Sequence, residues 1–180
     1  MNPEQTTAGR TAKTAASHIK FMGFDVDGTL TDGGLYFGPQ GEVFKQFSVF
    51  DGQGLRLLMD HGICVAWITA RSSTIVEKRA SDLGIAYVVQ GCKNKLQAFD
   101  AIRQSLKLGW ESCGFFGDDW PDYPVIKKVA LACTTPTAPQ AMRNTANWIN
   151  TRPAGHGGVR ELCDFILSHQ AHYNNPWEQN

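Results

Sequence analysis

The stretch FMGFDVDGTLTD, residues 21–32, carries a short apolar segment directly into a glycine-containing turn with two carboxylates. Residues two apart in an extended strand project to the same side, so we expect Asp25 and Asp27 to converge beyond the carboxyl end of this strand. Two carboxylates so close repel each other unless a divalent cation binds between them or one keeps its proton. Either arrangement suits an enzyme that forms a covalent intermediate on one carboxylate and moves protons with the other.

The composition favours one domain in a reducing compartment. The chain has 180 residues, 42% of them hydrophobic, and its 17 basic and 17 acidic side chains cancel, so no overall field attracts nucleic acid or a membrane surface. Five cysteines without a Cys-x-x-Cys pair favour free thiols, and we expect a cytoplasmic protein without a membrane span. We expect a disordered tail over residues 1–18, a single domain over 19–170 and a frayed end over 171–180.

Apolar runs alternate with segments of helical character along the chain. The expected strands are residues 19–24, 63–68, 86–89, 114–116 and 129–133, and the expected helices are 52–60, 73–83, 95–106, 121–127 and 159–169. Such alternation is typical of an α/β fold, here a doubly wound, Rossmann-like parallel sheet with helices on both faces. Ligands of such sheets bind outside the carboxyl ends of the strands.

Residues 33–50 predict a small β-hairpin flap around the turn GPQG at 38–41. The other segments between the expected strands are too short to hold an inserted cap domain. The segment carries more aromatic side chains than a solvated hairpin normally exposes: Tyr36, Phe37, Phe44 and Phe47. They either form a contact face for another subunit or pack on their own domain.

Further polar side chains stand where later strands should end, on the same edge of the sheet as the first two acids. They are Thr69, Lys95, Asp118, Asp119 and Asp122. Each has a plainer interpretation when taken alone: a strand or cap threonine, a solvated lysine, and aspartates that cap the helix at 121–127. An Asp-Gly pair such as that at 27–28 likewise often marks only a turn. The order of these residues and their common edge favour a joint function.

The chemical types in this set match the needs of a phosphate monoester. Asp25 would attack phosphorus, while Asp27 would protonate the leaving oxygen and then activate water. Asp118 would complete an oxygen-ligated magnesium site with Asp25, because Mg²⁺ prefers hard oxygen ligands. Thr69 and Lys95 would hold the remaining phosphoryl oxygens.

The segments around these residues resemble the four motifs of the haloacid dehalogenase superfamily of phosphatases. DVDGTLTD at 25–32, Thr69, Lys95 and GDD at 117–119 with Asp122 carry this resemblance. Further segments resemble the 3-deoxy-D-manno-octulosonate 8-phosphate phosphatase family: FDGQG at 50–54, ITAR at 68–71, QGCKNK at 90–95 and GHGGVRE at 155–161. The resemblance covers about residues 19–167.

The resemblance implies a magnesium-dependent enzyme that releases phosphate and 3-deoxy-D-manno-octulosonate, a precursor of bacterial lipopolysaccharide. It also implies a homotetramer in which a neighbour's carboxyl-terminal segment closes the site. Ala70, Ala154 and Gly158 depart from the family's pattern, which bears on substrate and tail geometry more than on reaction type.

Site roles also carry over from the resemblance. Asp25 matches the nucleophile, Asp27 the acid/base and backbone-carbonyl metal ligand, and Asp118 a metal ligand, with Asp122 in support of the metal site. The threonine and lysine named above match phosphate-binding positions.

A sugar-acid substrate also requires a cation for its carboxylate. We expect Arg71 and Arg160 to bind it, because guanidinium groups hold carboxylates in a bidentate fork, although a solvated arginine is the ordinary alternative. His156 either reaches a neighbour's substrate or lies in a mobile loop. The alternative functions are a phosphatase of a nine-carbon sugar-acid 9-phosphate and a phospho-acceptor signalling domain. Asp27, as a group that can transfer protons, favours an enzyme that releases the phosphoryl group over a signalling domain that stores it. The segment GHGGVRE favours the eight-carbon substrate over the nine-carbon one.

Overall fold

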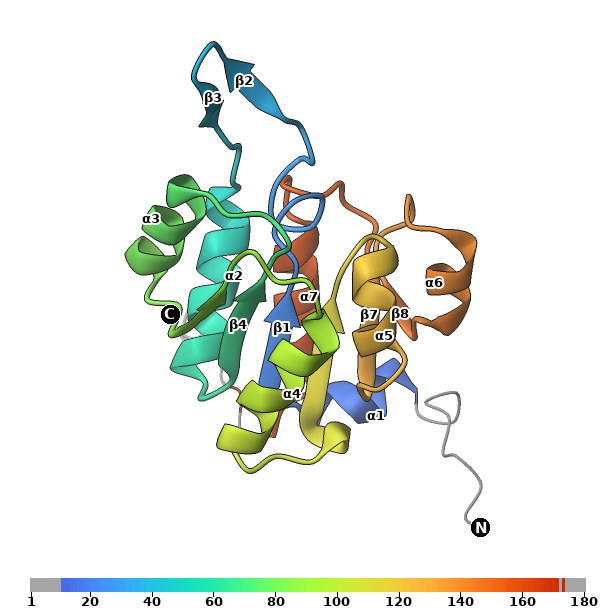
Figure 1. Cartoon of the computed structure of the whole chain (residues 1–180). Coiled ribbons are helices and arrows are strands. Elements are labelled where there is room, and N and C mark those ends of the chain that lie inside the picture. Colours follow the sequence, from blue (N-terminus) through green and yellow to red (C-terminus); the bar gives the residue numbers. More distant parts are fainter. Residues whose placement is uncertain (1–10, 172, 174–180) are drawn as a thin grey trace.

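The computed structural model describes residues 11–171 and 173, and its centre is a parallel sheet (Figure 1). The six strands follow the order β5-β4-β1-β6-β7-β8. They are β1 (Phe21–Phe24), β4 (Cys64–Ile68), β5 (Tyr87–Val89), β6 (Cys113–Phe116), β7 (Leu131–Thr134) and β8 (Trp148–Ile149). Every neighbouring pair runs parallel. The chain enters at the middle of the sheet and winds outward in both directions, which confirms the predicted doubly wound topology.

Helices cover both faces of this sheet, as predicted (Figure 1). They are α1 (Ala12–Ala16), α2 (Val49–Asp60), α3 (Thr74–Leu83), α4 (Lys95–Ser105), α5 (Tyr123–Ile126), α6 (Gln140–Thr145) and α7 (Gly158–His169), with short 3-10 turns η2 (Trp110–Ser112) and η3 (Trp120–Asp122). Side chains of α1, α2, α3 and α7 form one buried cluster, and those of α4, α5 and α6 form the other. Met22 and Phe24 of β1 pack into the first cluster and Phe21 into the second, because alternate strand residues point to opposite faces.

The predicted hairpin consists of β2 (Tyr36–Gly38) and β3 (Gly41–Phe44), and it projects away from the sheet in Figure 1. Phe37 and Phe44 are 60% and 52% exposed. Phe47 differs from these two, since it is partly buried and its ring stacks on that of Trp67. It therefore belongs to its own domain and not to an exposed contact face. Within the described residues, the chain between β1 and α2 holds this hairpin and no larger inserted domain.

Helix ends follow local hydrogen bonding. α2 begins three residues earlier than expected because the Ser48 hydroxyl accepts backbone N–H groups of its first turn. Gly84 ends α3 in the left-handed conformation. Ser73 is at the N-cap position before α3, but its hydroxyl donates to Glu42 Oε2 at 2.7 Å and makes no capping hydrogen bond. The helix expected at 121–127 is divided into η3 and α5.

The expected amino-terminal tail is wrong where the structure describes it. Residues 12–16 form α1, capped by Thr11, and Ala15 and Ala16 are buried against the core, so small apolar side chains suffice to dock this segment. α6 and β8 were not predicted. The other parts of the two expected tails, residues 1–10, 172 and 174–180, lie outside the described residues. No helix in the described part of the chain is long and apolar enough to cross a membrane.

Candidate active site

The carboxyl ends of β1, β4 and β6 bring Asp25, Thr69 and Asp118 to one edge of the sheet, because parallel strands end on the same side. Lys95 joins them from the first turn of α4. Its Nζ lies 2.7 Å from Asp25 Oδ1 and 2.6 Å from Asp122 Oδ1, and 3% of its side chain is exposed. Burial opposes the charge on Lys95, but the two carboxylates together raise its pKa, so the lysine stays ionised.

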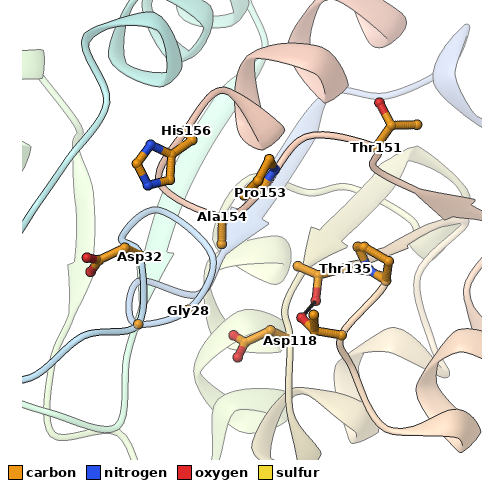
Figure 2. Close-up of a pocket in the computed structure, with 11 residues that line it drawn as sticks. Gly28, Asp32, Asp118, Thr135, Thr151, Pro153, Ala154 and His156 are labelled. Carbon is orange, nitrogen blue, oxygen red and sulfur yellow. Dashed lines mark hydrogen bonds between the residues drawn. The ribbon is translucent and has the colours of Figure 1, made fainter.

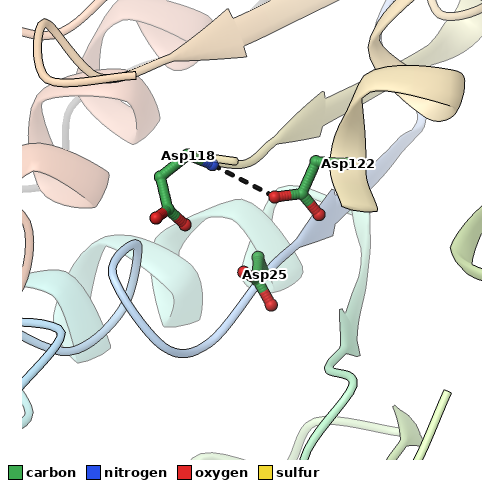
Figure 3. A group of neighbouring side chains, drawn as sticks. All are labelled: Asp25, Asp118 and Asp122. Atoms are coloured by element: carbon green, nitrogen blue, oxygen red, sulfur yellow. Dashed lines mark hydrogen bonds between the residues drawn. The ribbon is translucent and has the colours of Figure 1, made fainter. Parts of the chain in front are cut away.

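Asp25, Asp118 and Asp122 form a compact carboxylate cluster (Figure 3). Each offers one oxygen, and these oxygens lie within 4.8 Å of one another. Burial raises the pKa of Asp118 to about 7, and repulsion from the other two carboxylates adds to the effect. Burial also raises the pKa of Asp25, against the opposing charge of Lys95. Three crowded acids with hard oxygen donors fit a divalent cation such as Mg²⁺.

Asp122 holds the loop that carries Asp118. Its Oδ2 accepts hydrogen bonds from the backbone N–H groups of Asp118 at 3.1 Å and Asp119 at 3.4 Å, while Oδ1 pairs with Lys95. Gly117 permits this approach, since a Cβ there would lie 2.3 Å from the carboxyl carbon of Asp122. Both oxygens are engaged within the protein, an arrangement that suits support of a metal site.

Asp27 contacts a different set of groups, on the side of the hairpin. Lys45, from the segment after β3, forms an ion pair with Asp27 Oδ1, and its Nζ lies 2.8 Å from Glu42 Oε1. The hydroxyl of Thr69 lies 3.5 Å from Asp27 Oδ2. Burial opposes the charge on Lys45, yet hydrogen bonds to the two carboxylates raise its pKa above the ordinary value. The sequence did not identify Lys45 or Glu42 as site residues.

The two arginines predicted to bind substrate lie in different surroundings. Arg71 Nη2 donates to Glu42 Oε1 at 3.2 Å, and Arg71 Nε lies 3.8 Å from Asp27 Oδ2. Its side chain is 40% exposed and borders the site. Arg160 Nε instead pairs with Asp164 at 2.8 Å, one turn along α7. The structure therefore places Arg71, but not the Arg160 guanidinium, beside the predicted acid/base.

A cavity of about 540 Å³ opens beside Asp118 (Figure 2). The turn after β1, the loop after β7 and the glycine-rich segment before α7 line it, with Gly28, Asp32, Asp118, Thr135, Pro153 and His156 among the lining residues. Asp32, Asp118, His156 and three threonines are the polar residues of a lining that also includes prolines and an alanine, and they can hydrogen-bond a ligand with hydroxyl groups. His156 therefore borders the site of its own chain, and its ring Nε2 lies 3.2 Å from Gln46 Nε2.

Two glycines allow the cavity walls to approach the acids. Gly28 has φ +87°, and a Cβ there would lie 2.4 Å from Asp118 Oδ2. Gly155 has φ +67°, and a Cβ there would lie 2.5 Å from the backbone nitrogen of Asp32. Beside the first of these glycines, the Thr29 hydroxyl donates to Asp118 Oδ1 at 3.0 Å. Thr29 was not identified as a site residue from the sequence. Its place inside the first acidic motif, where a hydroxyl can donate to a neighbouring carboxylate, is the feature that indicates such a role.

The chain is similar to known proteins over most of its length. The curated 3-deoxy-D-manno-octulosonate 8-phosphate phosphatase KdsC of Salmonella typhi is 40% identical over 154 residues, which cover 86% of this chain and 82% of the relative. The chain belongs to this phosphatase family. The KdsC phosphatase of Escherichia coli strain K12 is also 40% identical, over 84% of this chain and 81% of its own length. No protein-family model matches the chain.

A solved structure of the phosphatase family has the same fold. The crystal structure of 3-deoxy-D-manno-octulosonate 8-phosphate phosphatase from Moraxella catarrhalis, in complex with a magnesium ion, a phosphate ion and KDO, matches with a TM-score of 0.86. It is 37% identical, and the match covers 88% of this chain and 91% of that one. The predicted resemblance to this phosphatase family, and with it to the haloacid dehalogenase superfamily, is confirmed.

Proposed function

We propose that this chain hydrolyses 3-deoxy-D-manno-octulosonate 8-phosphate to 3-deoxy-D-manno-octulosonate and phosphate, in the synthesis of lipopolysaccharide precursors. The observation that carries the proposal is the meeting of Asp25, Lys95, Asp118 and Asp122 beside a cavity, in a chain of this family. Buried acids around a buried ammonium suit the binding of a metal ion and the charge of a transferring phosphoryl group.

Each predicted catalytic residue has a role in this reaction. Asp25 forms a bond to phosphorus as the phosphorus–oxygen bond to the sugar breaks, and Asp27 gives its proton to the leaving oxygen. A water molecule then bonds to phosphorus as the bond to Asp25 breaks, and Asp27 takes a proton from that water. Thr69 and Lys95 bind the oxygens of the phosphoryl group.

The donor set supports magnesium as the cofactor. Asp25, Asp118 and the backbone carbonyl of Asp27 are the proposed ligands, and Asp122 orients the loop of Asp118. When bound, Mg²⁺ neutralises charge on the phosphoryl oxygens and offsets the repulsion between the clustered acids. Burial, with a smaller contribution from that repulsion, raises the pKa of Asp118 and of Asp122 to about 7.

The carboxylate of the sugar acid is assigned to Arg71. This guanidinium is partly exposed and borders Asp27, whereas that of Arg160 is paired with Asp164. A bidentate arginine distinguishes a sugar acid from a neutral sugar phosphate, which supports a sugar-acid substrate but does not by itself separate eight carbons from nine.

We also propose a homotetramer in the cytoplasm. The exposed apolar side chains of the hairpin, Leu35, Phe37, Val43 and Phe44, support an interface between subunits. The described chain has free cysteines at all five positions, which supports a reducing compartment. Sedimentation at micromolar concentration should give a species of about four times the chain mass of 19.8 kDa, and a monomer would contradict the tetramer.

A panel of sugar phosphates assayed with Mg²⁺ tests the function. The wild type should release phosphate from the eight-carbon 8-phosphate faster than from the nine-carbon 9-phosphate or neutral sugar phosphates. Asp25→Asn should lose about 1,000-fold or more of the activity while remaining folded, because it removes the nucleophile. Asp60→Asn, an exposed position on α2, is the matched control.

Two results would contradict the function. One is a folded wild type that is inert toward every ester and forms no beryllium fluoride adduct at Asp25, the mimic of an acyl phosphate. The other is an Asp25→Asn variant that keeps its activity.

A further inference from the structure

Lys45 is a buried cation directed at the predicted acid/base. Only 1% of its side chain is exposed, and lysines are rarely buried unless they are paired. Its Nζ contacts Asp27 Oδ1 and lies 2.8 Å from Glu42 Oε1. The ammonium group thus points inward from the hairpin segment to a carboxylate that the proposed reaction uses.

This contact distinguishes the two oxygens of Asp27. Oδ1 is occupied by Lys45, while Oδ2 lies 3.5 Å from the hydroxyl of Thr69 and 3.8 Å from Nε of Arg71. The terminal torsion of an aspartate is broad and nearly two-fold, so external contacts must fix the plane of the carboxyl group. With Oδ1 held, Oδ2 is the oxygen that faces the predicted phosphate-binding side.

Glu42 fixes the position of Lys45 in turn. Its Oε1 accepts from Lys45 and from Arg71, and its Oε2 accepts from the Ser73 hydroxyl at 2.7 Å at the start of α3. The side chain of Glu42 is only 13% exposed and that of Lys45 1%, so the ion pair between these two is shielded from water. The hairpin is therefore tied to the rigid sheet edge through charged groups that also contact Asp27.

We propose that Lys45 is a positioning residue, which holds Oδ1 of Asp27 so that Oδ2 is aligned with the oxygen of the leaving alcohol. The inference rests on the proposed phosphatase function and adds a residue from the hairpin to its machinery. A misplacement of about 1 Å of a group that transfers a proton costs up to about 100-fold in rate, which makes such positioning measurable.

The test varies the leaving group. An alkyl phosphate depends strongly on protonation of its leaving oxygen, whereas 2,4-dinitrophenyl phosphate does not, because its phenolate leaves without a proton. The value of kcat/KM reports the steps up to departure of the leaving group and is the quantity to compare. In the presence of Mg²⁺, Lys45→Met should lower kcat/KM roughly 10- to 100-fold for alkyl phosphates and less than about 3-fold for 2,4-dinitrophenyl phosphate.

Lys78→Met is the matched control, since Lys78 lies on α3 with 76% of its side chain exposed and pairs with the nearby Asp82. It should leave both substrates unchanged. In an Asp27→Asn background, Lys45→Met should have no further effect on kcat/KM for the alkyl phosphate, because Lys45 acts through Asp27. If Lys45→Met does not fold, the same kinetic measurements are made on Lys45→Gln, which keeps a polar head group.

A loss that is equal for all leaving groups in a folded variant would overturn the proposal and leave Lys45 with a structural role. An undiminished effect of Lys45→Met in the Asp27→Asn background would overturn it as well. Either result is distinct from failure of the proposed function, which would appear as absent phosphate release by the wild type itself.

Discussion

The hydroxyl of Thr29 donates a hydrogen bond to Oδ1 of Asp118 at 3.0 Å, across 89 positions of the chain. Thr29 is 1% exposed, so this contact is shielded from water. Groups that orient a metal ligand commonly contribute 10- to 100-fold to metal affinity, and we expect Thr29→Val to raise the apparent Mg²⁺ constant roughly 10-fold. The maximal rate at saturating Mg²⁺ should change little, which a titration of phosphate release against Mg²⁺ measures.

Thr145→Val is the control for that substitution. Its hydroxyl donates to the backbone oxygen of Ala141 within α6, away from the acids. It should leave the Mg²⁺ constant unchanged. An unaltered constant in Thr29→Val, or an equal shift in both variants, would contradict a role for Thr29 in orienting Asp118.

The stability of the metal-free protein should fall as the pH rises toward 7. The pKa values of Asp118 and Asp122 are raised from the ordinary 3.8 to about 7, chiefly by burial. A carboxyl group with a raised native pKa binds protons more tightly in the folded state, so its stabilising effect is complete below the ordinary pKa and is lost as the pH rises through about 7. Thermal unfolding in a chelator, followed across this range, measures the loss.

Mg²⁺ should reverse that loss, because a cation offsets the repulsion between the ionised acids. The thermal shift on adding Mg²⁺ should therefore be larger above pH 7 than below it, and binding should release protons near that pH. Calorimetry in buffers of different ionisation enthalpy counts the protons. A Mg²⁺ shift that is independent of pH would contradict the raised pKa values.

Arg71→Ala should separate substrate recognition from chemistry. Loss of a bidentate guanidinium should raise KM for the sugar-acid phosphate about 10- to 100-fold, while KM for a generic aryl phosphate, which has no carboxylate, should change much less. Steady-state kinetics on both esters makes the comparison within one variant. Equal losses would assign Arg71 to maintenance of the site through Glu42, which it contacts at 3.2 Å.

The sheet and its acids could be predicted because their signals are local. β1 and β6 are buried on both faces, so each reads as an uninterrupted apolar run, and the rule that ligands lie beyond strand ends then places Asp25 and Asp118 together. Family resemblance added the roles of these residues but not their contacts. No pattern of spacing indicated which other side chains would meet them.

The missed parts depend on tertiary contacts. Lys45 and Glu42 have the pattern of ordinary charges in a solvated hairpin, and only the folded structure shows that Lys45, directly after β3, pairs with both Asp27 and Glu42. Helix α1 has no apolar periodicity, and its alanines become informative only when they are packed against the core. The strand β8 has two residues, Trp148–Ile149, too few for a pattern to be recognised.

Asp51 should be required to hold the glycine-rich segment against the cavity. From α2 its carboxylate accepts backbone N–H groups of Arg160 at 2.7 Å and Gly157 at 3.2 Å, at the start of α7. Asp51→Asn replaces one acceptor oxygen with a donor, which leaves a buried N–H group unpaired and should cost about 1–3 kcal/mol of unfolding free energy. Denaturant titration measures this loss, with the exposed Asp60→Asn on the same helix as control.

The same substitution should also affect catalysis selectively. The segment that Asp51 anchors carries His156 and Pro153 into the cavity wall, whereas Asp25 lies directly after β1. At a temperature where the variant is folded, kcat/KM for the sugar-acid phosphate should fall more than that for a small aryl phosphate, because only the larger substrate extends into the cavity. Losses of equal size would show that this segment supports the fold without shaping the substrate site.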